Sequence, residues 1–189
     1  MSDLEAALAA LKRGGVILYP TDTVWGLGCD ATNARAVERI YELKQRSDAK
    51  ALITLLGSPS DLERWVDGVP EVAYQLLEAA VEPLTVVYDR ALVPPLAANL
   101  PAPDGSLAVR ITADPFCREL CRRLRRPLVS TSANISGSPT PKRFADIPKQ
   151  LLDAVDYVCT SGRRAPAEPR KPSTIMKLTE SGVITIIRP

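Results

Sequence analysis

The sequence predicts an α/β fold in which helices flank a mixed β-sheet within a single domain. Helical and strand patterns alternate along the chain, which is typical of a sheet covered by helices. Back-to-back strand patterns near the C-terminus indicate that antiparallel pairs join the parallel ones. The length of 189 residues suits one large domain, since domains commonly hold about 100 to 200 residues. We therefore expect residues 1–189 to form one domain with a sizeable core.

The N-terminal elements follow from helix caps and apolar periodicity. Ser2 and Glu5 form a capping box for an amphipathic helix, which Gly14 and Gly15 end. The apolar run at 16–19 predicts a strand that stops at Pro20. Asn33 can cap a second helix that ends around residues 44–46. A strand over 52–56 and helices over 59–65 and 70–80 come next.

The C-terminal part continues this alternation. Residues 84–88 and 107–111 predict strands, and the Pro-rich stretch 93–105 between them predicts a surface loop. Asp114 caps a basic helix that we expect to run through residue 126. Further strands are predicted at 127–129, 155–159, 174–178 and 183–187. The segment 162–172 combines arginines with Pro and Ala, which predicts a flexible basic loop that could close over an anion.

Composition excludes several classes of chemistry. Apolar residues make up 46% of the chain, charged residues 24%, and the net charge is +2, all ordinary for a globular protein. No apolar run approaches the roughly 18 to 20 residues that span a bilayer, and the N-terminal stretch is acidic, so we expect a cytoplasmic protein without a membrane anchor. Histidine is absent, which excludes Ser-His and Cys-His nucleophiles. Neither a Walker P-loop nor a GxGxxG motif occurs.

The four cysteines predict reduced thiols. They contain no CxxC pair, and a chain without a secretion signal seldom carries a disulfide framework. Cys117 and Cys121 stand four residues apart on a predicted helix, where they share one face. We interpret them as small core-facing residues, and no metal site is implied.

A polar run follows the strand predicted at 127–129. Residues 130–137 read Ser-Thr-Ser-Ala-Asn-Ile-Ser-Gly, which places Ser132 and Asn134 near a strand end, where ligands of α/β sheets gather. The run therefore predicts a binding loop. The alternative is a Ser/Asn turn that caps the next helix through hydrogen bonds from side chain to backbone.

Further polar groups complete a candidate anion pocket. Thr21 and Thr23 also follow a strand, and cations stand near other element ends, at Lys44, Arg46, Lys50 and Arg110. Arginine binds carboxylate or phosphate as a planar fork and lysine binds as a point charge, so the mixture suits a polyphosphate beside a small acid. Each cation could instead be a solvated surface residue, which is the usual role of lysine and arginine.

At four places the chain resembles the YrdC-like L-threonylcarbamoyladenylate synthases. The matching blocks are Pro-Thr-Asp-Thr-Val-Trp-Gly-Leu-Gly at 20–28, Lys-Gln-Arg at 44–46, Val-Arg-Ile at 109–111 and Ser-Ala-Asn-Ile-Ser-Gly at 132–137. They occur in the family's order, and Pro-Ser-Thr-Ile at 172–175 and the final Arg-Pro extend the resemblance to the C-terminus. The resemblance implies a twisted open sheet with a concave basic face, in the stand-alone form of the family.

The resemblance also implies a reaction and a set of site residues. Such enzymes join L-threonine, bicarbonate and ATP into threonylcarbamoyl-AMP and pyrophosphate, for the threonylcarbamoyladenosine modification of tRNA. The catalytic set that matches is Lys44, Arg46, Ser132 and Asn134. The L-threonine set is Thr23, Arg110, Ser132 and Ser173. The ATP set is Arg46, Lys50, Ser106, Asn134, Thr140 and Arg188.

Cofactor and partner expectations follow from this chemistry. The adenylate transfer needs Mg²⁺ to balance the triphosphate, held mainly by phosphate oxygens, and no protein ligand is assigned. Partners would be tRNA or double-stranded RNA and the proteins that transfer the threonylcarbamoyl group to tRNA. Two other hypotheses stay open. The chain could be a non-catalytic RNA-binding module, as the basic helix after Asp114 suggests, or a diverged paralogue with another nucleotide-dependent activity.

Overall fold

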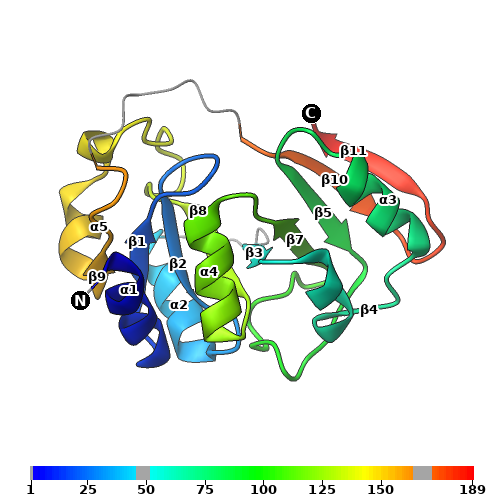
Figure 1. The fold of residues 1–189 in the computed structure, drawn as a ribbon, viewed down its shortest axis with the longest axis horizontal. Coiled ribbons are helices and arrows are strands. Elements are labelled where there is room, and N and C mark those ends of the chain that lie inside the picture. Colours follow the sequence, from blue (N-terminus) through cyan, green and yellow to red (C-terminus); the bar gives the residue numbers. More distant parts are fainter. Residues whose placement is uncertain (1, 46–51, 164–171) are drawn as a thin grey trace.

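The sheet is mixed, as the sequence predicts. The structure is a computed structural model that describes residues 2–45, 52–163 and 172–189. Within these residues nine strands form one sheet, in the order β11-β10-β5-β7-β3-β8-β2-β1-β9 (Figure 1). The bounds of its strands are β1 Ile17–Tyr19, β2 Gly26–Asp30, β3 Ile53–Leu56, β5 Leu84–Tyr88, β7 Leu107–Ile111, β8 Leu128–Ser132, β9 Tyr157–Val158, β10 Thr174–Leu178 and β11 Ile184–Arg188. The short strands β4 Val66–Asp67 and β6 Arg90–Ala91 form a separate antiparallel pair.

The sheet contains three parallel pairs of neighbouring strands and five antiparallel pairs. The pairs β3–β7, β5–β10 and β1–β9 are parallel, and the other neighbours in the sheet are antiparallel. The register aligns Arg110 with Leu55 on one side and with Thr85 on the other. Gly26 stands opposite Ser132. β1 lies next to the edge strand β9, and β11 forms the other edge. The N- and C-termini therefore lie at opposite ends of the sheet (Figure 1).

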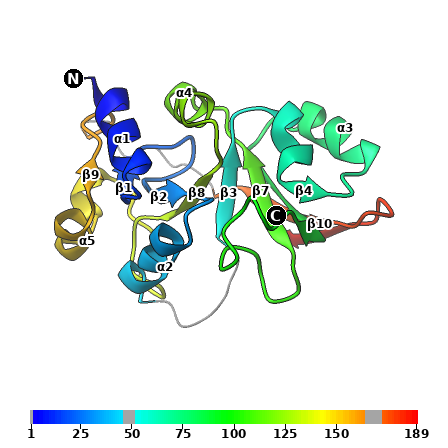
Figure 2. The ribbon, with the colours of Figure 1, turned by 90° about the horizontal axis from the view of Figure 1, so that it is seen from below.

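Helices lie on both faces of the sheet. The helices α1 Asp3–Lys12 and α4 Pro115–Leu124 lie side by side on one face, and α2 Ala34–Leu43 lies on the other (Figure 2). The helices α3 Glu71–Ala79 and α5 Lys149–Ala154 flank the two ends of the molecule, with the 3₁₀ turns η1 Pro59–Arg64 and η2 Phe144–Asp146. Ser2 and Asn33 cap α1 and α2 as their sequences predict, and Ser2 forms the full capping box with Glu5.

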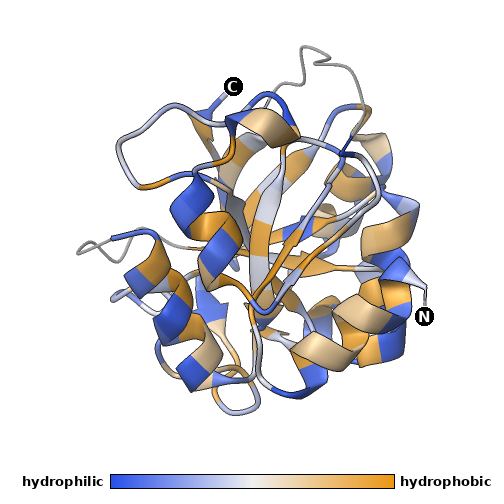
Figure 3. Cartoon of the chain, turned by 90° about the vertical axis from the view of Figure 1, so that its left-hand side faces the viewer, coloured by the Kyte–Doolittle hydropathy of each residue, from blue (hydrophilic) through white to orange (hydrophobic). Residues whose placement is uncertain are grey.

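Two apolar clusters hold these layers together. One lies between α1, α4 and the sheet, and includes Leu11, Leu55 and Leu120. The larger one joins α2 and α3 to the sheet, with Ile40, Val109 and Trp65 among its members. Strands in the interior are mostly hydrophobic, whereas the helices carry both hydrophobic and hydrophilic residues (Figure 3). Burial of these apolar side chains is the main stabilising contribution, at about 25 cal/mol per Å².

The helix predicted at 59–65 forms, as the 3₁₀ helix η1. Two other predicted boundaries are wrong. The basic helix stops at Leu124, because Arg125 adopts a left-handed conformation with φ +58° that ends the helical hydrogen bonding. The strand predicted at 127–129 continues through Ser132, since residues 130–132 pair with β2, so these polar residues lie in β8 rather than in a loop.

The expectations about the cysteines are confirmed within the described residues. All four cysteines are buried free thiols, and Cys117 and Cys121 share the buried face of α4. No helix in the described part of the chain is long and apolar enough to cross a membrane. The predicted basic loop at 162–172 lies largely outside the described residues.

Candidate functional site

Lys44 lies at the centre of a buried polar cluster. It follows the last residue of α2, and only 3% of its surface is exposed. Its Nζ donates to the carbonyl oxygens of Ser132 and Asn134 at 2.6 and 2.9 Å, and to Asn134 Oδ1 at 3.2 Å. The backbone is tied in the same way, since Ser136 N donates to Lys44 O at 3.0 Å. The end of α2 is therefore bound directly to the end of β8.

The side chains of Ser132 and Asn134 orient each other. Ser132 Oγ donates to Asn134 Oδ1 at 2.5 Å, and Asn134 Nδ2 donates to Ser138 O at 2.6 Å. Asn134 is 7% exposed, so its amide is held in a partly desolvated setting. Because Oδ1 accepts from both Ser132 and Lys44, the amide orientation follows from its partners. These three side chains form one preorganised unit, which we call the lysine cluster.

The loop between β1 and β2 is held by a buried hydroxyl. Thr21 Oγ1 accepts from Thr23 N and Val24 N at 3.1 and 3.2 Å, and donates to Val24 O at 2.7 Å. At the base of this loop, Cys117 Sγ donates to Pro20 O at 3.5 Å. Burial raises the pKa of the Cys117 thiol well above its usual value, so the thiol stays neutral and keeps its proton for this contact. The loop is thereby fixed at both its start and its turn.

Arg110, which lies in β7, contacts the loop between β1 and β2. The residue is 4% exposed, and its Nη1 donates to Thr23 Oγ1 at 3.1 Å. Nη2 lies 3.2 Å from Asp22 Oδ1, which is a charge contact because this oxygen accepts no hydrogen bond. The other Asp22 oxygen accepts from Ala113 N at 3.3 Å. Arg110 Nε is buried and has no partner among the described residues, so the guanidinium retains donor capacity.

Thr85, Ser173 and Arg188 form another group of polar residues, next to Arg110. Thr85 is aligned with Arg110 in the register, and its Oγ1 lies 2.8 Å from Ser173 Oγ. Both hydroxyls are nearly inaccessible, with Thr85 0% and Ser173 2% exposed. Arg188 from the edge strand donates through Nε and Nη2 to Ser173 O at 3.2 and 2.6 Å. Ser173 is thus held through both its side chain and its backbone.

Two glycines of β2 make room for the packing beneath the loop. A Cβ on Gly28 would lie 2.6 Å from both Tyr19 Cε1 and Val129 O, closer than real contacts allow. A Cβ on Gly26 would meet Thr21 Cγ2 at 3.2 Å. Tyr19 is fully buried, which raises the pKa of its hydroxyl well above the usual value. The tyrosine ring therefore supports the loop as a packed, uncharged group.

The structure brings most of the predicted site residues into these groups. Lys44, Ser132 and Asn134 form the lysine cluster, Thr23 contacts Arg110, and Arg188 contacts Ser173. Ser106 instead bonds the Asp104 carboxylate, with Oγ at 2.6 Å. Thr140 is exposed. Arg46 and Lys50 lie outside the described residues.

Sequence reasoning missed two side chains of this region. Asp22 stands within the quoted block at 20–28, but its pairing with Arg110 spans 88 positions of the chain and has no local signal. Thr85 interrupts an otherwise apolar strand, and a single hydroxyl in such a run was the available clue. Both residues contact predicted site residues: Asp22 forms an ion pair with Arg110, and Thr85 is hydrogen-bonded to Ser173.

The fold and these groups define an α/β protein with a buried cationic and hydroxyl-rich site on a mixed sheet. Residues 9–189 match the Sua5, YciO and YrdC family, which is described as "Telomere recombination". The chain therefore belongs to this family. One relative, from Stenotrophomonas maltophilia, is named threonylcarbamoyl-AMP synthase. It is 37% identical over 168 residues, which is 88% of this chain and 90% of the relative.

Solved structures agree with this assignment. The P. abyssi Sua5 structure, a complex with L-threonine, superimposes with a TM-score of 0.83 and 28% identity. It aligns with 93% of this chain and 50% of that one. E. coli YciO superimposes with the same TM-score at 26% identity, over 98% of this chain and 87% of its own. This chain is similar to YciO along most of both lengths.

Proposed function

We propose that this chain is a threonylcarbamoyl-AMP synthase, which joins L-threonine, bicarbonate and ATP and releases pyrophosphate. Its curated relatives carry that name at 37% identity and above across most of the chain. The observation that carries the proposal is the lysine cluster, where a buried ammonium is held by the Ser-Ala-Asn segment. Such a donor array suits a reaction in which charge must be positioned and neutralised without a histidine.

The lysine cluster is proposed to bind the nucleotide. Lys44 supplies a positive charge for phosphate oxygens, and Asn134 supplies an amide held by Ser132. Arg46 and Lys50 would add positive charge from the segment that follows α2, and Ser106, Thr140 and Arg188 complete the set carried over from the family. Of these, Arg188 has a contact that ties it to another proposed residue, since it binds Ser173 O.

Arg110 is proposed to bind the carboxylate of L-threonine. A guanidinium pairs with a carboxylate through two parallel hydrogen bonds, and burial strengthens such a contact. Thr23 and Ser173 are proposed to read the polar groups of the amino acid, with Ser132 facing the same ligand. The L-threonine complex of P. abyssi Sua5 supports an amino-acid site in this fold.

The proposed reaction has two steps whose atoms balance. The threonine amine first combines with bicarbonate to form a carbamate, and water leaves. A carbamate oxygen then attacks the α-phosphorus of ATP, and the bond to the β-phosphate oxygen breaks, so that pyrophosphate departs. Both partners of the second step are anionic, so alignment and charge neutralisation are the tasks of the site.

We infer that Mg²⁺ accompanies ATP in this reaction. Mg²⁺ is usually held by one or two carboxylates together with substrate phosphates, and it neutralises the charge of the triphosphate. In the described residues no group of three His, Cys, Asp or Glu side chains lies close enough to hold a metal ion. We expect the phosphate oxygens of ATP to provide most of the Mg²⁺ ligands, because Mg²⁺ is commonly bound through substrate phosphates.

We also propose that the product serves tRNA modification. A mixed anhydride of a carbamate and AMP is a reactive acyl donor, so a group-transfer protein must take it up soon after release. The proposed partners are the proteins that move the threonylcarbamoyl group to tRNA, with tRNA or double-stranded RNA as a direct ligand of this chain.

The test is pyrophosphate release by the purified protein. We expect release that needs ATP, L-threonine and bicarbonate together, and that falls to background in Lys44→Ala and Asn134→Ala. Lys149→Ala is the matched control, because Lys149 is an exposed lysine paired with Asp153 on α5, and it should keep full activity. Thermal melting of each variant separates loss of function from loss of fold.

Two other outcomes would redirect the proposal. ATP binding without threonine-dependent release would indicate a diverged paralogue. RNA binding that falls steeply with salt, with neither ATP nor threonine bound, would indicate a non-catalytic RNA-binding module.

A further inference from the structure

Arg110 and Asp22 form an ion pair in which each side chain keeps one unused polar atom. Arg110 Nη2 lies 3.2 Å from Asp22 Oδ1, and the two side chains are 4% and 16% exposed. Arg110 Nε and Asp22 Oδ1 are buried, and neither atom has a hydrogen-bond partner in the described part of the chain. Because Nε can only donate and a carboxylate oxygen can only accept, the pair offers one free donor and one free acceptor.

Other contacts hold both side chains in place. Arg110 Nη1 donates to Thr23 Oγ1 at 3.1 Å, and Asp22 Oδ2 accepts from Ala113 N at 3.3 Å. Asp22 and Thr23 belong to the loop between β1 and β2, whereas Ala113 follows β7. Since the loop and the end of β7 fix the pair, its unused atoms keep defined positions.

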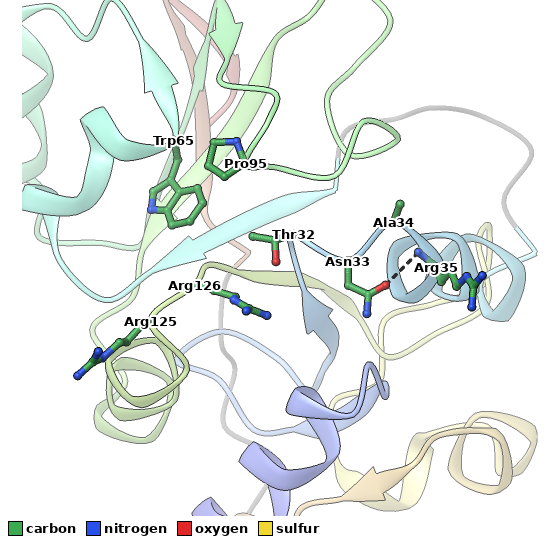
Figure 4. A pocket seen from close by; sticks show the side chains of 8 residues that line it. All are labelled: Thr32, Asn33, Ala34, Arg35, Trp65, Pro95, Arg125 and Arg126. Carbon is green, nitrogen blue, oxygen red and sulfur yellow. Dashed lines mark hydrogen bonds between the residues drawn. The ribbon is translucent and has the colours of Figure 1, made fainter.

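A second ion pair, between Asp30 and Arg126, shows a carboxylate of this fold that is fully hydrogen-bonded. Asp30 Oδ2 accepts from Arg126 Nη1 at 2.7 Å, and Oδ1 accepts from Thr32 N and Thr32 Oγ1 at 2.9 and 2.7 Å. Arg126 and Thr32 line a surface cleft at the end of β2 (Figure 4). Both oxygens of Asp30 therefore have partners, whereas Asp22 Oδ1 has none among the described residues.

The unused atoms of Arg110 and Asp22 indicate a ligand. Buried polar atoms are almost always hydrogen-bonded, and an unsatisfied atom of a charged group is especially costly. A ligand that supplies an acceptor to Arg110 Nε and a donor to Asp22 Oδ1 removes this cost. An α-amino acid carries both, because its carboxylate accepts, its ammonium donates, and the two groups are attached to the same carbon.

We propose that Asp22 binds the ammonium group of the amino-acid substrate while Arg110 binds its carboxylate. The inference rests on the proposed synthase function and adds a residue to the L-threonine set. Asp22 Oδ1 accepts a hydrogen bond from the ammonium of the bound substrate. Asp22 thereby selects the class of substrate, which is an α-amino acid with a free amino group.

The charges of the pair favour the same class of ligand. The charges of Arg110 and Asp22 sum to zero, and so do those of the carboxylate and the ammonium of L-threonine. A carboxylic acid without the amino group would bring a negative charge next to Asp22, and repulsion between like charges is strong in a buried site. Asp22 should therefore weaken the binding of such acids while it strengthens the binding of L-threonine.

The substitution Asp22→Asn tests this role, because the amide keeps the size of the carboxylate and removes its charge. The ligands are L-threonine and 3-hydroxybutyrate, which is threonine without its amino group. Each is titrated calorimetrically into the purified protein in the presence of a non-hydrolysable ATP analogue. We expect Asp22→Asn to weaken L-threonine binding roughly tenfold or more and to strengthen 3-hydroxybutyrate binding. A purely structural role of Asp22 would weaken the binding of both ligands.

The substitution Asp30→Asn is the matched control. It also removes the charge of an arginine-paired aspartate, but at the other end of β2. This variant should bind both ligands as the wild type does. Thermal melting shows whether each variant is folded at the temperature of the titration.

The inference is overturned if the wild type binds no L-threonine, or if the two affinities do not shift in opposite directions in Asp22→Asn. Pyrophosphate release is measured separately, so that the synthase activity is judged on its own. Opposite shifts without threonine-dependent release would support the role of Asp22 and reject the synthase. Release by the wild type without opposite shifts would keep the synthase and reject the role of Asp22.

Discussion

The two halves of the sheet differ in how they are covered, although both contribute to the candidate site. β1 and β2 are buried at every residue, because helices cover the sheet on both faces there. At the other edge, β11 is exposed at every residue, and Ile186 and Ile187 are 65% and 58% exposed. The lysine cluster belongs to the covered half, whereas Arg110 and Thr85 lie in β7 and β5, and Ser173 directly precedes β10.

This difference suggests that the two halves of the sheet have different functions in the site. A covered half has packed side chains that cannot shift, which suits the positioning of a reacting phosphate. The other half holds hydroxyl and guanidinium groups that suit recognition of an amino acid. Substitutions in the covered half should therefore reduce turnover or stability, and substitutions around Arg110 should reduce threonine affinity.

The largest effect is expected for Lys44→Met. Removing the ammonium leaves an apolar side chain of similar length, and the loss of one preorganised donor typically costs about 10²–10³ in turnover. The kcat for threonine-dependent pyrophosphate release should fall by this factor. Lys149→Met on α5 is the control and should leave kcat unchanged. A Lys44→Met protein with normal kcat would remove the lysine cluster from the reaction.

Arg110→Lys should act mainly on threonine affinity. Lysine keeps the charge beside Asp22 but loses the planar fork, and hydrogen bonds to charged groups are worth about 1.5–3 kcal/mol. The KM for L-threonine should rise roughly 10- to 100-fold, with kcat at saturating threonine nearly kept. A fall in kcat with an unchanged KM would contradict the proposed division between the two halves.

Gly28→Ala should destabilise the covered half. The new Cβ would lie 2.6 Å from both the Tyr19 ring and Val129 O, and overpacking of this kind costs about 1–3 kcal/mol. Chemical denaturation should show the loss as a lower midpoint with an unchanged slope. Gly26→Ala, whose nearest contact would be 3.2 Å, should cost less. Equal losses would mean that the two glycines share a role other than space for the ring.

Thr85→Val and Thr54→Val form a matched pair, since both threonines are fully buried in central strands. Thr85→Val removes the partner of Ser173 Oγ, so it should cost about 1 kcal/mol in unfolding free energy and raise the KM for threonine a few-fold. Thr54 Oγ1 has no hydrogen-bond partner among the described residues. Its replacement should be neutral or stabilising and should not change the KM. Identical behaviour of the two variants would show that Ser173 needs no orientation by Thr85.

The smallest effect is expected on the stability of Asp3→Asn, because Asp3 contacts Tyr157 in the edge strand β9. The pKa of Asp3 lies well below its usual value. Partial burial by itself would raise this pKa, but hydrogen bonds from Tyr157, Thr160 and Ser161 to the carboxylate outweigh that effect. This stabilisation is fully present above the unfolded pKa of about 3.9 and is lost as the pH falls below it. Asp3→Asn should lower stability at neutral pH by about 1 kcal/mol or less and flatten its decline in acid. Urea denaturation of the wild type and of Asp3→Asn at pH 7 and pH 3 measures the loss of stability at neutral pH and the decline in acid. If the stability of the two proteins fell by the same amount between pH 7 and pH 3, the result would count against the Asp3 contacts.

Local patterns accounted for many of the elements. The caps of α1 and α2 act within four residues of chain, so Ser2, Glu5 and Asn33 were readable without any tertiary information. The apolar runs of β5 and β7 were equally plain. The polar residues 130–132 were assigned to a loop, because their strand conformation depends on pairing with β2, which polarity does not reveal.

The sequence by itself determined the helix starts, the apolar strands, the reduced thiols and the signature blocks that indicate the family. Only the tertiary structure decided how the site residues meet. Lys44 and Ser132, Thr85 and Ser173, and Thr23 and Arg110 are separated by 88, 88 and 87 positions. Caps and periodicity are interactions between near neighbours, whereas these contacts depend on strand order and register, which are settled by packing across the whole sheet.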